Sequence, residues 1–168
     1  MDEDSSPMST LVLDTDRLRL VLETTDAVLA RIDALSPEDR AQVSPDWIAQ
    51  MRRSAPSAWT HGFAMVERAT DAAVGSAGFK GPPANGVVEI AYAVNPAYQG
   101  RGYAKESAAA LADFAFSHDE VRIVRAHTLP HKNPSTSVLT ACGFECLGEV
   151  VDPEDGLVWR WERAAPSE

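Results

Sequence analysis

One strand-to-helix passage restricts the possible folds of this chain more than any other feature. Residues 87–94 have the composition of a strand, which Asn95-Pro96 stops because a residue before proline avoids the helical region. Further along, apolar side chains recur at spacings of four, three and four, at Ala104, Ala108, Leu111 and Ala115. This recurrence predicts an amphipathic helix between Gly102 and Ser117 with a packing face of small residues. A strand that leads directly into a long helix indicates a domain in which helices and strands interleave.

Hydrophobic periodicity divides the rest of the chain into shorter elements. Further strands are predicted at residues 17–22, 63–67, 73–79, 121–128, 144–151 and 157–161. Further helices are predicted at residues 26–35, in a short segment after Ser44-Pro45-Asp46, and at residues 134–142, ended by Gly143. No internal repeat interrupts this order. The fold class is therefore α/β of the α+β kind, with one mixed, mostly antiparallel sheet flanked by helices.

Charge and composition exclude several classes of function. The 168 residues, 45% hydrophobic and 24% charged, are typical of one soluble domain, preceded here by a polar tail at residues 1–10. A net charge of -10 leaves no general basic surface for nucleic acid or anionic lipid. The acidic start and the lack of an apolar run of ~20 residues favour a cytoplasmic protein without a membrane span. Cys142 and Cys146 have no second Cys/His pair at zinc-ligand spacing, so we expect reduced thiols and no metal site.

The turn before the long helix has the composition of an anion-binding site. Gly100 and Gly102 flank Arg101, and glycine lets the backbone adopt positive φ and approach a ligand closely. The first turn of a helix leaves about four N–H groups without partners, and the helix dipole adds about half a positive charge there. These features suit a pyrophosphate, although a plain tight turn needs the same glycines. A third glycine at dinucleotide-fold spacing and a Gly-Lys-Ser/Thr sequence are both missing, which disfavours two other phosphate-binding loops.

Three motifs, in the right order, resemble the GNAT superfamily of N-acetyltransferases. Residues 99–104 (Gln-Gly-Arg-Gly-Tyr-Ala) resemble its motif A, with Ala104 where many members have glycine. Residues 13–20 resemble the opening of the ribosomal-protein N-terminal (alanine/serine) acetyltransferase branch, and residues 133–139 followed by Gly143-Phe144 resemble its closing motif. The resemblance covers residues 11–163, which implies one acyltransferase domain between the tail at 1–10 and a C-terminal tail at 164–168.

The resemblance also implies where acetyl-CoA would bind as co-substrate. In the family's fold the strand before motif A parts from the next strand and leaves a gap for pantetheine, and here those strands are residues 87–94 and 121–128. The backbone of Tyr92, Ala93 and Val94 would pair with pantetheine, as a peptide pairs with a strand edge. The pyrophosphate would lie on motif A, comprising Gln99, Gly100, Arg101, Gly102, Tyr103 and Ala104. Asn133 would hydrogen-bond pantetheine or the backbone beside it.

The family reaction is direct attack of a neutral primary amine on the thioester in a ternary complex, so a base and a thiol proton donor are needed. By the resemblance we nominate Glu89 as the base, acting through water. An ordinary surface carboxylate would suit the same position, and His127 is an alternative base because imidazole titrates near neutrality. Ser135 matches the motif serine and is the candidate thiol-side donor, although a helix cap would use the same segment.

The sequence departs from the branch in the last predicted helix. Ser137 stands where a basic residue is common, Thr140-Ala141 where Glu-Lys is common, and no tyrosine is present there to act as an acid. Three tryptophans, Trp47, Trp59 and Trp159, suit either an acceptor pocket or the core.

The acceptor is expected to be a primary amine, either a protein N-terminus or a small molecule. Its recognition is expected to lie in the loops around residues 36–61 and 152–156, which carry no readable motif. A homodimer through an exposed edge strand at residues 157–163 is a further expectation. The alternative function is a non-catalytic CoA-binding sensor or interaction module on the same fold.

Overall fold

The computed structural model describes residues 11–53, 57–153 and 156–166. The predicted N-terminal tail, residues 1–10, and part of the predicted acceptor loops lie outside the described residues. At the other end the last strand continues to Ala164, one residue into the predicted C-terminal tail.

Eight strands of the described residues form one sheet in the order β1-β2-β3-β4-β5-β6-β8-β7. Their bounds are β1 Val12–Asp14, β2 Leu18–Leu22, β3 Phe63–Glu67, β4 Ala73–Phe79, β5 Val87–Val94, β6 Ile123–Thr128, β7 Glu145–Asp152 and β8 Gly156–Ala164. All neighbours are antiparallel except β5 and β6, which are parallel. The predicted mixed, mostly antiparallel sheet is therefore confirmed.

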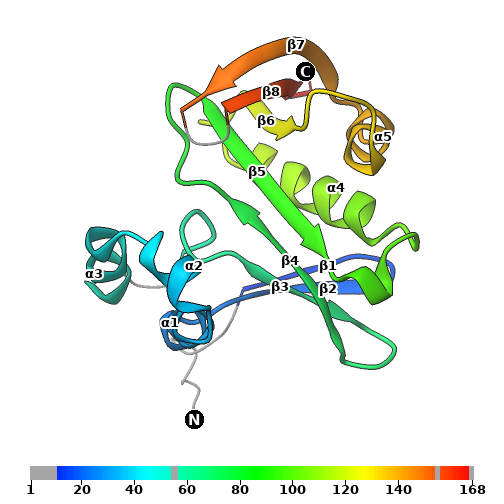
Figure 1. Cartoon of the computed structure of the whole chain (residues 1–168). Coiled ribbons are helices and arrows are strands. Elements are labelled where there is room, and N and C mark those ends of the chain that lie inside the picture. The colour runs from blue at the N-terminus through cyan, green and yellow to red at the C-terminus, as the bar shows by residue number, and fades with distance from the viewer. Residues whose placement is uncertain (1–10, 54–56, 154–155, 167–168) are drawn as a thin grey trace.

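The helices flank this sheet, as predicted (Figure 1). Their bounds are α1 Thr25–Asp33, α2 Pro37–Ala41, α3 Pro45–Arg53, the 3-10 turn η2 Pro96–Tyr98, α4 Tyr103–Phe116 and α5 Pro134–Ala141. Helix α4 packs against β5 and β4 on one face, whereas α1, α2 and α3 form a group at one side of the molecule (Figure 1). Within the described ranges, none of the helices is long and apolar enough to cross a bilayer.

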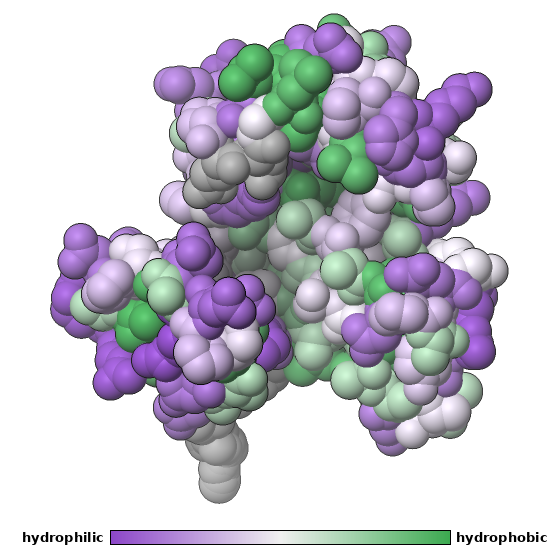
Figure 2. Space-filling view, viewed as in Figure 1, coloured by the Kyte–Doolittle hydropathy of each residue, from purple (hydrophilic) through white to green (hydrophobic). Residues whose placement is uncertain are grey.

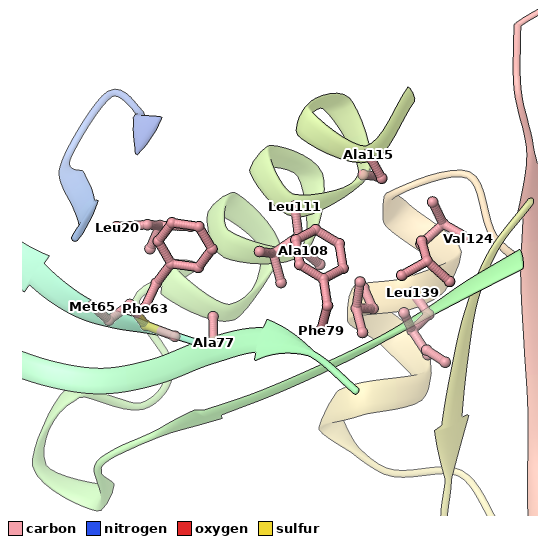
Figure 3. Packing of buried hydrophobic residues seen from close by; sticks show 14 of the residues in the cluster. Leu20, Phe63, Met65, Ala77, Phe79, Ala108, Leu111, Ala115, Val124 and Leu139 are labelled. Atoms are coloured by element: carbon pink, nitrogen blue, oxygen red, sulfur yellow. The ribbon is translucent and has the colours of Figure 1, made fainter. Parts of the chain in front are cut away.

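The core lies between α4 and the sheet (Figure 3). Ala108, Leu111 and Ala115, three of the four residues of the predicted stripe, are fully buried against side chains such as Phe63 of β3. Small residues on this face allow the helix to approach the strands closely. The stripe thus fixes α4 on the sheet and holds its N-terminus beside the end of β5.

Strands β5 and β6 separate after three paired positions. Val87, Val88 and Glu89 pair with Ile123, Val124 and Arg125. Beyond them β5 continues on β4, with Val94 opposite Gly75, while β6 continues on β8. The splayed sheet that the family resemblance implied is therefore present, and it opens beside residues 90–94.

Some element predictions were wrong. The predicted exposed edge at residues 157–163 belongs to β8, which lies between β6 and β7, so β7 forms that edge of the sheet. Strand β6 begins at Ile123 instead of residue 121, because the Val121 and Arg122 N–H groups donate to the His118 and Gly86 carbonyls. Strand β1 and helix α2 were not predicted, since three and five residues are too short to show a period.

Candidate active site

A cleft of about 720 Å³ lies where β5 and β6 separate, over the N-terminus of α4. The end of β5, the turn before α4, the end of β6 and the start of α5 all contribute to it. Its lining includes Tyr92, Ala93, Val94, Gln99, Gly100, Gly102, Tyr103, Ala104, His127, Asn133, Pro134 and Ser135. Most of the residues that the sequence assigned to acetyl-CoA therefore come together in one cleft.

The start of α4 presents backbone donors to this cleft. Gly100 and Gly102 have φ of 80° and 85°, and Gly102 is the left-handed N-cap of the helix. The first-turn N–H groups that follow have no partners within the helix itself. Lys105, in the same turn, also lines the cleft. Sequence reasoning overlooked this cation, although a lysine three residues after Gly102 is a readable signal for an anion site.

The predicted cation Arg101 is directed elsewhere. Its Nη1 lies 3.8 Å from Oε2 of Glu67, and its guanidinium lies 5.2 Å from the ring centroid of Tyr98. Tyr103 donates a hydrogen bond to the same Glu67 carboxylate. That bond is the main cause holding the pKa of Glu67 below its ordinary value of 4.5. Lys105 lines the cleft, whereas Arg101 is not among its lining residues.

A polar clamp joins the start of β2 to α4. The Glu106 carboxylate accepts from Thr15 Oγ1 at 2.6 Å, from Arg17 N at 3.1 Å and from Arg17 Nε at 2.5 Å. The guanidinium of Arg17 also lies 4.9 Å from the ring centroid of Tyr103. Thr15 and Arg17 belong to the opening motif, so this motif positions the helix that begins with motif A.

Gln99 and Asn133 have structural partners at the two ends of the cleft. Gln99 Nε2 donates to the Val94 carbonyl at 2.9 Å, which closes the turn after β5. Asn133 is the N-cap of α5: its Oδ1 accepts from Thr136 N at 3.1 Å, and its Nδ2 donates to the His131 carbonyl at 3.1 Å. Since Asn133 provides the cap, Ser135 is free to face the cleft.

Ser135 lies beside a tyrosine that was expected to act only through its backbone. The side chains of Ser135 and Tyr92 hydrogen-bond to each other. Burial raises the pKa of the Tyr92 phenol to about 12, although the bond to Ser135 opposes this effect. A phenol with this pKa remains a proton donor throughout the neutral range. The alternation of β5, in which Val88 and Ile90 face the core, was a signal that Tyr92 points the same way.

Glu89 and His127 form a second polar group, on the other face of the two strands. His127 Nδ1 lies 2.9 Å from Oε2 of Glu89, and Lys80 Nζ lies 3.4 Å from the same oxygen. Arg160 Nε donates to His127 Nε2 at 3.1 Å, which leaves Nδ1 as the ring nitrogen that donates to Glu89. His127 lines the cleft, whereas Glu89 reaches it through its hydrogen bond to His127. The two candidate bases are thus hydrogen-bonded partners.

Comparison with known proteins identifies the family. Residues 11–145 match the sequence model of the acetyltransferase (GNAT) domain. An uncharacterized N-acetyltransferase, p20, from Bacillus licheniformis is 29% identical over 93 residues, which cover 55% of this chain. The match spans only about half, 52%, of that protein's length.

Solved structures share the whole fold. One described as a putative ribosomal-protein-serine acetyltransferase from Vibrio cholerae has a TM-score of 0.67 and 22% identity, covering 98% of this chain and 99% of its own. Another, a ribosomal-protein alpha-N-acetyltransferase in complex with coenzyme A, has a TM-score of 0.67 and 14% identity, covering 94% and 100%. The domain match together with the splayed sheet establishes that this chain belongs to the GNAT acetyltransferase family.

Proposed function

We propose that this protein transfers the acetyl group of acetyl-CoA to a primary amine. The observation that carries the proposal is the separation of β5 from β6 directly over the N-terminus of α4. This arrangement offers a strand edge to an amide-bearing chain and unpartnered N–H groups to a phosphate, which are the two chemical parts of coenzyme A.

The donor would lie along the cleft from α4 to β6. Its pyrophosphate would accept from first-turn N–H groups of α4, with Lys105 as counter-charge. Its pantetheine amides would pair with the free edge of β5 at residues 92–94. The thioester would then lie near Tyr92, His127 and Ser135, the polar side chains at the inner end of the cleft.

Glu89 would accept the proton that the acceptor ammonium must lose. His127 and Lys80 both contact Oε2, so they hold the carboxylate in place and leave Oε1 as the oxygen that takes the proton through a water. His127 is a poorer candidate, because its Nδ1 proton is directed at Glu89 and its Nε2 lone pair accepts from Arg160. We therefore assign Glu89 as base and His127 as the residue that positions it.

Tyr92 and Ser135 would serve the leaving group. The amine nitrogen forms a bond to the carbonyl carbon, the carbon–sulfur bond breaks, and the electron pair remains on sulfur as a thiolate. Tyr92 would donate its phenolic proton to that thiolate, with Ser135 hydrogen-bonded to the phenol, and the proton that the nitrogen loses as the amide forms would return to the phenolate. Tyr92 thus supplies, from β5, the acid that the last helix lacks.

The experiment that tests this function is a turnover assay with acetyl-CoA and a panel of primary amines and short peptides, with product detected by mass spectrometry. Glu89→Gln and Tyr92→Phe are each expected to lower kcat by about 100-fold, the typical contribution of acid–base catalysis, with acetyl-CoA affinity unchanged. Glu149→Gln, on an exposed position of β7, is the matched control and should behave as the parent. Tight acetyl-CoA binding without acetylation of any amine would instead support the non-catalytic alternative.

A further inference from the structure

A second cavity, of about 310 Å³, lies on the sheet face opposite α4. Its floor is made of small residues on adjacent strands, where Ser76 and Gly78 of β4 pair with Ala93 and Ala91 of β5. Large side chains here would fill the space, so these residue types keep the sheet surface open. Figure 2 shows the same face hollowed between the helix group α1–α3 and the upper half of the sheet.

One wall of this inner cavity is polar. Glu23 and Arg31 line it, and both carboxylate oxygens of Glu23 lie 2.5 Å from Nη1 of Arg31. The Glu23 side chain is 14% exposed, whereas that of Arg31 is 53% exposed and reaches solvent. The two charges are paired with each other, so this wall offers polar atoms without a net charge.

A third cavity, of about 370 Å³, continues the hollow toward α3 and is aromatic. It shares Thr60 and Phe79 with the inner cavity and is lined by Trp47 and Trp59. Trp59 is fixed by an edge contact with Phe79, with ring centroids 4.8 Å apart. Trp47 is 38% exposed, so part of its indole is accessible to a ligand in this cavity. Of the three tryptophans considered from the sequence, Trp159 lies outside this cavity.

The inner cavity also reaches the acetyl-transfer cleft. Tyr92 and Ala93 line both, so the two spaces meet at the end of β5 where the thioester would lie. The inner cavity in turn shares Thr60 and Phe79 with the cavity that Trp47 and Trp59 line. We propose that these two cavities form the acceptor site and that it selects a primary amine carrying an aromatic ring, with the ring in the cavity that the two tryptophans line. This inference rests on the proposed function and specifies its substrate class.

The test compares 2-phenylethylamine with ethylamine, which lacks the ring. We expect the parent to favour 2-phenylethylamine by at least about tenfold in kcat/KM, the scale on which an apolar pocket discriminates. Trp47→Ala should reduce that preference several-fold, because kcat/KM should fall further for 2-phenylethylamine than for ethylamine. Leu35→Ala, at a residue with the same 38% exposure outside both cavities, is the control. Trp59→Leu, at the half-buried tryptophan of the same cavity, is the second variant and should act in the same direction.

Two sources of the ring are distinguished by the peptides Ala-Phe-Ala and Ala-Ala-Ala. A preference for the phenylalanine peptide that exceeds the preference between the two amines indicates a peptide acceptor, and the reverse indicates a small arylalkylamine. Equal rates for ring-bearing and ring-free acceptors, or a Trp47→Ala variant that retains the full preference, would overturn the inference while leaving acetyl transfer intact.

Calorimetric binding of 2-phenylethylamine to the CoA-loaded protein requires no turnover. If no amine is acetylated, the proposed function fails, and this binding, together with its loss in Trp47→Ala, still decides the ring inference.

Discussion

The buried imidazole of His61 makes the stability of this protein dependent on pH. His61 is 3% exposed, its Nε2 lies 2.8 Å from Thr25 Oγ1, and burial lowers its pKa below the ordinary value of 6.5. The unfolded chain then binds the proton more strongly, so the free energy of unfolding falls as the pH drops below about 6.5. The slope for one proton is at most about 1.4 kcal/mol per pH unit.

Urea denaturation between pH 5 and 7.5 measures this slope. His61→Gln cannot bind this proton, so its free energy of unfolding should depend less on pH. His131→Gln, at an exposed position, should keep the pH dependence of the parent. A slope that His61→Gln leaves unchanged would show that the acid sensitivity comes from other groups.

A second residue expected to affect the free energy of unfolding is Ser107. Its hydroxyl is fully buried on α4, and among the described residues it has no hydrogen-bond partner. An unpaired buried hydroxyl costs about 1–3 kcal/mol, so Ser107→Ala should raise the free energy of unfolding by about 1 kcal/mol. Ser137→Ala, at an exposed position of α5, controls for the helix propensity of alanine. A loss of stability in Ser107→Ala would mean that the hydroxyl has a partner in solution.

Single residues were also where sequence reasoning succeeded or failed most clearly. Gly100 and Gly102 could be predicted as positive-φ positions, because only glycine adopts such turns without strain. The pairing of Glu89 with His127 could not, since the two residues are 38 positions apart and meet only through the parallel pairing of β5 and β6. Arg101 stays a predicted phosphate ligand, and the ion pair between its Nη1 and Oε2 of Glu67, at 3.8 Å, could not be predicted because Glu67 comes from a different strand.

At the scale of elements, the position of β5 depends on a glycine in β4. A Cβ at Gly75 would lie 2.3 Å from the Ala93 carbonyl oxygen, a backbone atom that can yield only if β5 shifts. Gly75→Ala should therefore displace residues 93–94 and weaken acetyl-CoA binding, by about tenfold for a loss of ~1.4 kcal/mol. Ser76→Ala, the adjacent residue on the opposite face, is the control. Equal acetyl-CoA affinities of Gly75→Ala and Ser76→Ala, measured by calorimetry, would argue against pairing between pantetheine and β5.

The clamp between β2 and α4 yields a separate expectation. Glu106→Gln removes the charge that accepts from Thr15 and Arg17, and hydrogen bonds to charged groups contribute about 1.5–3 kcal/mol. Because Arg17 is 48% exposed, we expect Glu106→Gln to lower the free energy of unfolding by an amount at the low end of that range. The KM for acetyl-CoA should rise while kcat is unchanged, because only the helix start moves. Asp71→Asn, which breaks an exposed ion pair with Arg19, should change neither the free energy of unfolding nor the KM for acetyl-CoA.

Elements with a strong period were predictable and short ones were not. Strands β3, β4 and β5 were predicted with the bounds that the structure has, since each is framed by turn residues. Strand β6 was predicted two residues too long, because Val121 continues its apolar pattern without joining the sheet. Periodicity reports which face a residue occupies, and it does not report where pairing begins.

At the scale of the whole molecule, the proposed acetyl-CoA cleft was easier to predict than the proposed acceptor site. The cleft is built largely from one continuous segment, residues 92–105, whose motif is local in sequence. The proposed acceptor site combines Glu23, Trp47 and Trp59 with residues of β4 and β5, and only the fold brings these segments together. The strand order β6-β8-β7, which covers the predicted edge, depends on the same long-range pairing.

Calorimetric titration with acetyl-CoA shows whether the cleft over α4 binds this donor. Ala104→Glu places a carboxylate in the first turn of α4, where it suits the helix dipole and the fold but repels a phosphate. Ala109→Glu, further along the same helix and outside the cleft lining, is the control. We expect the parent and Ala109→Glu to bind one acetyl-CoA per chain, and we expect Ala104→Glu to bind none. Equal binding by all three proteins, or binding by none, would contradict this expectation.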